Sequence, residues 1–213
     1  MEPHGNQPIM REGAPLGTAP VVVMAHGRGA GPKNIFDLLP RLARPGFTYL
    51  APAAAGNTWY PYSFLAEIEK NEPGLSSALD VLARLVDDVI ARGIPSEQIV
   101  LLGFSQGACL TSEFAARHAR RYGGVIVFTG GLIGPDGTPR NYSGSFGGTP
   151  IFLGCSDVDG HVPKTRVDDT AAVFTRMGAQ VDERIYPGMG HLINDDEIAA
   201  AQAILDAVIT ARR

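Results

Sequence analysis

Short, uninterrupted apolar runs alternate with amphipathic segments along most of this 213-residue chain. The runs are rich in β-branched residues and lack polar alternate positions, which is typical of strands buried on both faces of a parallel sheet. The predicted strands are 21–24, 48–50, 99–104, 125–128, 151–153 and 181–186. The predicted helices are 34–44, 75–92, the segment from Ser105 to about 121, 165–177 and 195–211. The alternation predicts an α/β fold with a mostly parallel, doubly wound sheet and helices on both faces.

The length of the chain favours a single domain over residues 1–213, with 1–19 as an N-terminal extension. The net charge is −4 and no run of Lys or Arg is present, so we expect no nucleic-acid partner. No apolar stretch approaches the roughly 20 residues that span a bilayer, so we expect no stable membrane insertion. Residues 1–19 lack the features of a signal peptide, and a cytoplasmic protein is therefore expected.

Two irregular, glycine-containing segments interrupt the alternation, 51–74 and 130–149. Long loops in compact domains are usually functional or disordered, and aromatic residues in the first segment argue against disorder. We therefore predict that 51–74 forms a wall of the substrate site, with Trp59, Tyr60 and Phe64 as candidate pocket residues. Simple packing is the alternative role for these aromatic side chains.

The sequence Gly103-Phe104-Ser105-Gln106-Gly107 matches the G-x-S-x-G pattern of a nucleophile elbow. This pattern places a serine on a tight strand-to-helix turn, where flanking glycines allow neighbouring backbone to come close. The motif alone is weak, but here it follows a buried strand and opens a predicted helix, as the elbow requires. Ser105 is therefore the candidate nucleophile.

A serine hydroxyl needs a base that takes its proton, and five histidines are available. His4 in the N-terminal segment and His118 in a helix predicted to be exposed are interpreted as incidental. His26 at the end of the first strand is interpreted as shaping the following loop. The triad of a nucleophile-elbow enzyme runs Ser, acid, His along the chain, and His191 alone follows every plausible acid. A glycine-rich turn precedes His191 and would let its ring reach Ser105.

The acid should follow the strand at 151–153, at the carboxyl edge of the sheet. Asp157 and Asp159 both meet this condition, and counting residues from either side of the loop gives opposite answers. The acid orients the imidazole and stabilises its charged form, which either carboxylate can do. A metal site made by these two residues with His161 is the less favoured alternative, and we expect no metal and no cofactor.

Two backbone N–H groups should stabilise the oxyanion of the tetrahedral intermediate. Gln106 directly follows the nucleophile, and Arg28 lies in the glycine-rich loop after the first strand, so these two residues are the candidates. A phosphate-binding loop is excluded for this segment because the G-K-[ST] ending is absent. The two cysteines, Cys109 and Cys155, lie in apolar stretches and are predicted to be buried free thiols.

Together, the segments 26–29, 103–107, 159–163 and 188–191 resemble the phospholipase/carboxylesterase family, which includes the acyl-protein thioesterases. The resemblance covers about 19–207. It implies an α/β-hydrolase fold without a large cap domain and hydrolysis of carboxylic ester or thioester bonds. Dienelactone hydrolases share this fold but use a cysteine nucleophile, so the serine argues against their chemistry.

The family usually carries its acid in a D-x-x-V-P stretch, which favours Asp159, but its spacing from the strand glycine points to Asp157. Members often begin with an extra strand, for which 1–19 leaves little room. The resemblance also allows a homodimer.

We expect a serine esterase for small or medium acyl groups. The alternatives are a lysophospholipase or thioesterase for longer chains and a non-catalytic ligand-binding protein on the same scaffold.

Overall fold

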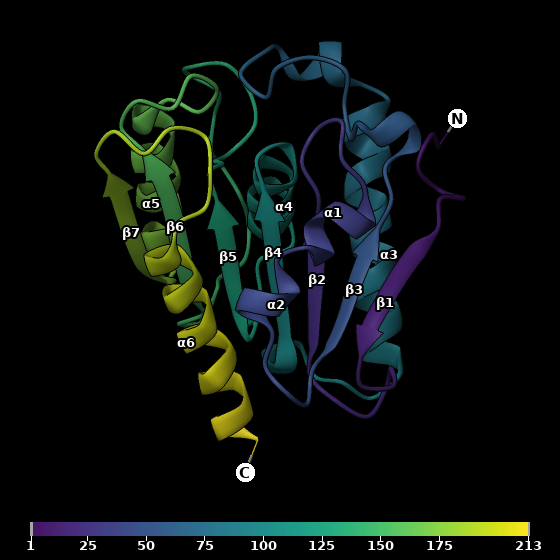
Figure 1. Cartoon of the computed structure of the whole chain (residues 1–213). Helices are drawn as coiled ribbons and strands as arrows, with labels where there is room; N and C mark the ends of the chain where they lie inside the picture. The colour runs from purple at the N-terminus through teal and green to yellow at the C-terminus, as the bar shows by residue number, and fades with distance from the viewer. Residues whose placement is uncertain (1, 213) are drawn as a thin grey trace.

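The computed structural model describes residues 2–212 and is built on a twisted sheet in the strand order β1-β3-β2-β4-β5-β6-β7 (Figure 1). The strands are β1 (Ile9–Gly13), β2 (Val21–Ala25), β3 (Thr48–Pro52), β4 (Ile99–Phe104), β5 (Gly124–Phe128), β6 (Pro150–Ser156) and β7 (Gln180–Tyr186). The helices are α1 (Pro32–Phe36), α2 (Leu39–Leu42), α3 (Gly74–Ala91), α4 (Gln106–Arg117), α5 (Lys164–Arg176) and α6 (Asp195–Ala211). Short 3₁₀ turns occupy Ala55–Asn57, Ile68–Asn71 and Ser96–Gln98. All strand pairs are parallel except β1 with β3, which confirms the predicted fold class.

The helices form one layer on each face of the sheet: α3, α4 and α5 lie behind it in Figure 1, and α1, α2 and α6 lie in front. Side chains of β2 show why its run is wholly apolar. Val21 and Val23 belong to the core under α3 and α4, whereas Val22 and Met24 belong to the core under α6. A strand buried on both faces leaves no position for a polar residue.

β1 lies within residues 1–19, so the expectation that this segment leaves little room for a strand is wrong. Its five residues are all exposed and show no alternation, so no apolar pattern marks it. It forms by antiparallel pairing with β3, with Ile9 opposite Pro52 and Gly13 opposite Thr48. Such pairing satisfies backbone groups at the sheet edge and depends on residues about 40 positions away.

The helix predicted over 34–44 is also wrong, because the structure has two short helices there, α1 and α2. The chain turns between them at Asp37 and Leu38. Pro40 has no backbone N–H and cannot continue an uninterrupted ladder of helical hydrogen bonds. The apolar spacing was real, since Ile35 and Leu42 are buried against the sheet.

The glycine-rich segment 130–149 is packed rather than loose. Leu132 and Ile133 are fully buried in it, and the Arg166 guanidinium on α5 donates to the carbonyls of Leu132 and Gly134.

Both cysteines are buried free thiols, as predicted. Burial raises the pKa of Cys109 and of Cys155 to about 12. Neither thiol is therefore a ready nucleophile at neutral pH. Among the described residues, no helix is long and apolar enough to cross a bilayer.

Glu197 is a buried acid at the start of α6, packed against the sheet. Its Oε2 accepts the N–H of Asn194, whose side chain in turn accepts the N–H of Glu197, forming a capping box. Its Oε1 has no hydrogen-bond partner among the described residues. Burial raises the pKa of Glu197 to about 7, from an ordinary value of 4.5. Because the folded protein favours the neutral form of this carboxyl group, the protein loses stability as pH rises and the group ionises.

We predict that Glu197→Gln stabilises the protein at high pH. Because the pKa is raised on folding, the wild-type contribution is fully present below pH 4.5 and is lost as pH rises through 7. The glutamine stays neutral and still accepts the Asn194 N–H. Relative to wild type, the variant should gain on the order of 1–2 kcal/mol between pH 5 and pH 8.

Urea unfolding at both pH values measures this difference. The exposed acid Glu12 on β1 provides a control substitution, Glu12→Gln. A difference between wild type and Glu197→Gln that stays constant with pH would contradict the role of the buried carboxyl.

Candidate active site

Ser105 occupies a sharp turn between β4 and α4, with φ +56° and ψ −120°. Residues with side chains rarely adopt such backbone angles, so the surrounding contacts must hold the turn in place. A Cβ on Gly103 would lie 2.3 Å from the Gly107 carbonyl oxygen, and a Cβ on Gly107 would lie 2.1 Å from the Ala25 carbonyl oxygen. Both glycines of the motif are thus required by close backbone contact. The turn presents the serine hydroxyl at the carboxyl edge of the sheet.

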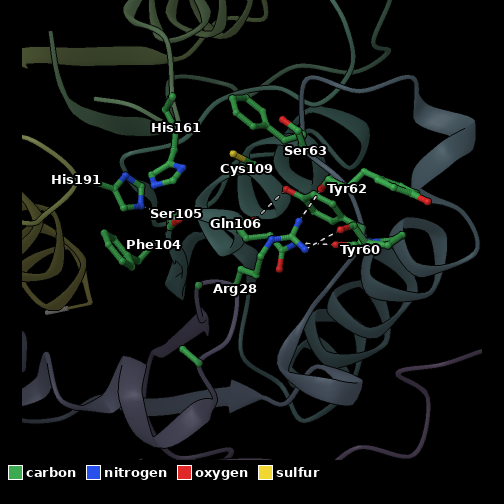
Figure 2. Close-up of a pocket in the computed structure, with 15 residues that line it drawn as sticks. Arg28, Tyr60, Tyr62, Ser63, Phe104, Ser105, Gln106, Cys109, His161 and His191 are labelled. Carbon is green, nitrogen blue, oxygen red and sulfur yellow. Dashed lines mark hydrogen bonds between the residues drawn. The ribbon is translucent and has the colours of Figure 1, made fainter. Parts of the chain in front are cut away.

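His191 reaches this hydroxyl from the loop after β7, and its Nε2 lies 2.8 Å from Ser105 Oγ. Its ring packs beside Phe104, with ring centres 5.3 Å apart, and edge-on to His161 at 4.8 Å. Figure 2 shows His161 and His191 together on one side of the cavity, facing Ser105. The two residues selected from the sequence as nucleophile and base are therefore in direct contact.

Asp159 binds the other nitrogen of the ring, with 2.7 Å between its Oδ2 and His191 Nδ1. Its Oδ1 accepts the backbone N–H groups of His161 and Val162 at 2.7 and 2.9 Å. Burial acts to raise the pKa of Asp159, but these N–H donors and the His191 ring outweigh burial and hold the pKa below its ordinary value. The carboxyl group is thus ionised at neutral pH and oriented by three donors.

Asp157 has a different contact: its Oδ1 accepts the N–H of Gly188 at 2.8 Å. The neighbouring Ser156 Oγ accepts the N–H of Gly190 at 3.0 Å. These two side chains hold the backbone of the loop that carries His191, and neither is hydrogen-bonded to its ring. Of the two aspartates left open by the sequence, Asp159 contacts the imidazole and Asp157 supports the loop. Within residues 2–212, no three His, Cys, Asp or Glu side chains are grouped to hold a metal ion.

The loop after β2 passes close to the nucleophile. A Cβ on Gly27 would lie 3.5 Å from Ser105 Cβ, which is ordinary van der Waals contact. The next residue, Arg28, has a backbone N–H without an acceptor among residues 2–212. Gln106 is the first residue of α4, where backbone N–H groups have no partner within the helix. Both candidate oxyanion donors thus lie beside Ser105 with backbone N–H groups free for a substrate.

Trp59 connects the start of α4 to the loop after β2. Its backbone N–H donates to Gln106 Oε1 at 3.0 Å, and its indole N–H donates to the His26 carbonyl at 2.8 Å. The Gln106 amide also donates to the Tyr60 carbonyl at 2.8 Å. Trp59 is fully buried and does not line the cavity. Its assignment as a pocket residue is therefore wrong. Its hydrogen bonds instead join the loop after β3 to the two segments that carry the candidate oxyanion donors.

His26 shapes its loop, in line with the sequence analysis. Its Nδ1 donates to the Gly27 carbonyl at 2.8 Å, and its Nε2 accepts the N–H of Ala54 at 3.1 Å. One nitrogen donates and the other accepts, so the ring is neutral. Desolvation by burial lowers its pKa, which favours that neutral form.

His4, set aside as a candidate base, does not line the cavity, but it has a structural role that the sequence did not indicate. It is buried, its Nε2 donates to the Trp59 carbonyl at 2.9 Å, and its Nδ1 accepts the N–H of Ala55 at 3.0 Å. Burial lowers its pKa as well. Nothing in the local sequence marks this contact, since its partners lie more than 50 positions away. His118 ends α4 and is half-buried, with its ring stacked on Phe114.

A cavity of about 540 Å³ opens beside Ser105 (Figure 2). Tyr60 and Phe64 line it, as proposed from the sequence. Arg28 also lines the cavity, and its guanidinium donates to the carbonyls of Pro61 and Tyr62 at 2.8 and 2.6 Å. The segment 51–74 thus forms one wall. Other lining residues were not identified from the sequence: Ser63 in the same segment, and Phe104, Cys109, His161 and Val162 from other parts of the chain.

The chain matches the model of the phospholipase/carboxylesterase family over residues 13–209. It is 31% identical to an acyl-protein thioesterase 1 of Eremothecium gossypii over 171 residues, which cover 74% of this chain and 68% of the relative. It is 27% identical to a probable carboxylesterase of Oryza sativa, covering 63% of this chain. The alignment spans only half the length of the rice protein.

Solved structures show the same likeness over the full chain. A phospholipase/carboxylesterase from Dyadobacter fermentans superposes with a TM-score of 0.91 at 43% identity, covering 98% of this chain and 99% of that protein. The esterase PE8 superposes with a TM-score of 0.75 at 24% identity, covering 95% of this chain and 98% of that protein. At that identity, the second structure supports the fold alone.

We predict that Asp159→Asn and Asp157→Asn have very different effects on turnover of an activated ester such as p-nitrophenyl acetate. An asparagine at 159 no longer stabilises the charged His191 ring and can favour the wrong tautomer, which costs about 10⁴-fold in kcat in comparable triads. An asparagine at 157 still offers an oxygen to the Gly188 N–H, so kcat should fall by no more than about tenfold in that variant. Steady-state kinetics of both variants, with circular dichroism to check folding, measures the contrast. A larger loss at 157 than at 159 would reverse the assignment of the acid.

Proposed function

The chain belongs to the phospholipase/carboxylesterase family and is a hydrolase with esterase activity, and we propose that Ser105, His191 and Asp159 carry out its chemistry. The observation that supports this assignment best is the unbroken line of contacts from Ser105 Oγ through His191 to Asp159, at 2.8 and 2.7 Å. Such a line is what activates a serine hydroxyl for attack on a carbonyl carbon.

In the proposed reaction, Ser105 Oγ attacks the carbonyl carbon of the ester while His191 Nε2 takes the hydroxyl proton. The backbone N–H groups of Arg28 and Gln106 donate to the oxyanion of the tetrahedral intermediate. The bond to the leaving group then breaks, and His191 gives its proton to the departing oxygen. Water then attacks the acyl-enzyme while His191 takes a proton from it. His191 returns this proton to Ser105 Oγ as the acid leaves. Asp159 stays ionised throughout and stabilises the charged ring. The cycle needs no cofactor.

We propose that the acyl group is small or of medium length. The cavity beside Ser105 has about 540 Å³, within the range of sites for small molecules. The Arg28 guanidinium, bound to the carbonyls of Pro61 and Tyr62, places a positive charge in the cavity lining. A long alkyl chain in this cavity would pack beside a charged group that it cannot pair with. A lysophospholipase or a thioesterase for longer chains remains the second candidate, because the curated relatives include acyl-protein thioesterases.

We also propose a substrate class, a cellular location and an oligomeric state for the enzyme. The substrate is a small-molecule ester or thioester, and the protein acts in the cytoplasm without a nucleic-acid partner. A homodimer is proposed for the assembly and is tested by light scattering on the purified protein. Cell fractionation tests the location.

We predict that wild-type protein hydrolyses p-nitrophenyl esters and that Ser105→Ala lowers kcat by at least about 10³-fold, because the nucleophile is lost. Assays from acetate to palmitate should give the highest kcat/KM at eight carbons or fewer. Ser63→Ala is the matched control, since Ser63 also lines the cavity but does not contact His191. Full activity of Ser105→Ala would disprove the mechanism. An optimum at palmitate would instead favour the long-chain candidate.

A further inference from the structure

A second cavity, of about 370 Å³, also borders His191 and is lined by residues of α1 and of the loop that precedes α6. We call it the α1 groove. It shares Gly27, Ala30, Phe104 and His191 with the first cavity. The two cavities differ in one respect that matters for chemistry: Ser105 lines the first and does not line the α1 groove.

The walls of the α1 groove are mainly apolar. Ile35 and Leu38 form one side, and Leu192 and Ile193 form the other. Leu192 is a large apolar side chain that remains 48% exposed. Arg41 is the one lining residue with a permanent charge among those described, and it is paired with Asp195. The groove therefore offers apolar surface next to the proposed general acid and no unpaired charge among the described residues.

The chemistry of the proposed reaction assigns different places to the two halves of the substrate. The acyl half becomes bonded to Ser105 Oγ, so it must occupy the cavity that Ser105 lines. The leaving half must hold its oxygen where His191 can protonate it, so it must extend along the His191 side. The α1 groove is lined by His191 but not by Ser105, which is what a site for the leaving half requires.

We propose that the α1 groove binds the leaving group of the substrate and that this group is an apolar alcohol or thiol. The proposal rests on the proposed function and adds the chemical class of the leaving group to it. During acylation the bond between Ser105 Oγ and the carbonyl carbon forms first, and the bond to the leaving oxygen or sulfur breaks as the tetrahedral intermediate collapses. His191 transfers to that atom the proton it took from Ser105, and the neutral alcohol or thiol departs along the groove.

Esters of one acid with alcohols of increasing length test the proposal. Ethyl, butyl, hexyl and octyl acetate all form the same acetyl-enzyme, so deacylation is identical and differences in kcat/KM report acylation alone. Each methylene that leaves water for an apolar wall should raise kcat/KM by about two- to fourfold. We expect this rise from ethyl to hexyl acetate in the wild-type protein.

Leu192→Ser should flatten this dependence on length by at least half, because it removes an apolar wall. Ile9→Ser is a matched control: Ile9 is also 48% exposed but lies on β1, outside both cavities. Its dependence on alcohol length should equal that of wild type. Leu38→Ala tests the opposite wall without altering a neighbour of His191, and it should also flatten the dependence.

The outcomes separate this proposal from the proposed function. Hydrolysis of all the acetates with kcat/KM independent of alcohol length would overturn the role of the α1 groove and leave the esterase mechanism intact. A length dependence that is equal in wild type, Leu192→Ser and Leu38→Ala would also overturn it. No Ser105-dependent hydrolysis of any acetate or p-nitrophenyl ester would overturn both proposals together.

Discussion

The close contact between the turn at Ser105 and the end of β2 constrains the rest of the site. Gly107 lies so near the carbonyls of Ala25 and His26 that no side chain fits between them. The contact keeps the serine in its uncommon backbone conformation and brings the loop that begins at Gly27 against it. Parallel strands place their carboxyl ends along one edge, so the loops after β6 and β7 meet the serine at the same edge.

The loop after β3 depends on this contact as well, through a buried polar network. Trp59 joins Gln106 on one side to the His26 carbonyl on the other, and two neutral imidazoles, His26 and His4, accept backbone N–H groups of that loop. Buried polar groups are stable only when they are paired, and here each ring uses both of its nitrogens. Through His4, the N-terminal segment is connected to the wall of the cavity although it contributes no residue to the cavity lining.

His191 lies where the two cavities meet, and its neighbours divide the work of holding it. Asp159 orients the ring, whereas Asp157 and Ser156 hold the backbone of its loop. This division explains why two aspartates stand two residues apart in one loop. The ring lines both the cavity beside Ser105 and the α1 groove.

The sequence by itself determined what depends on local pattern. Apolar runs of β2 and β4 predicted strands buried on both faces, and the glycines around Ser105 predicted the turn, since close backbone contact excludes any other residue there. Tertiary structure alone decided what depends on distant partners. β1 exists because β3 pairs with it, and Trp59 lies behind the cavity because His26 and Gln106 bind it there. The contact of His191 with Asp159 rather than Asp157 was decided in the same way. The two aspartates are chemically identical and two positions apart, so only the path of the loop, set by N–H donors at His161, Val162 and Gly188, determines which carboxylate reaches the ring.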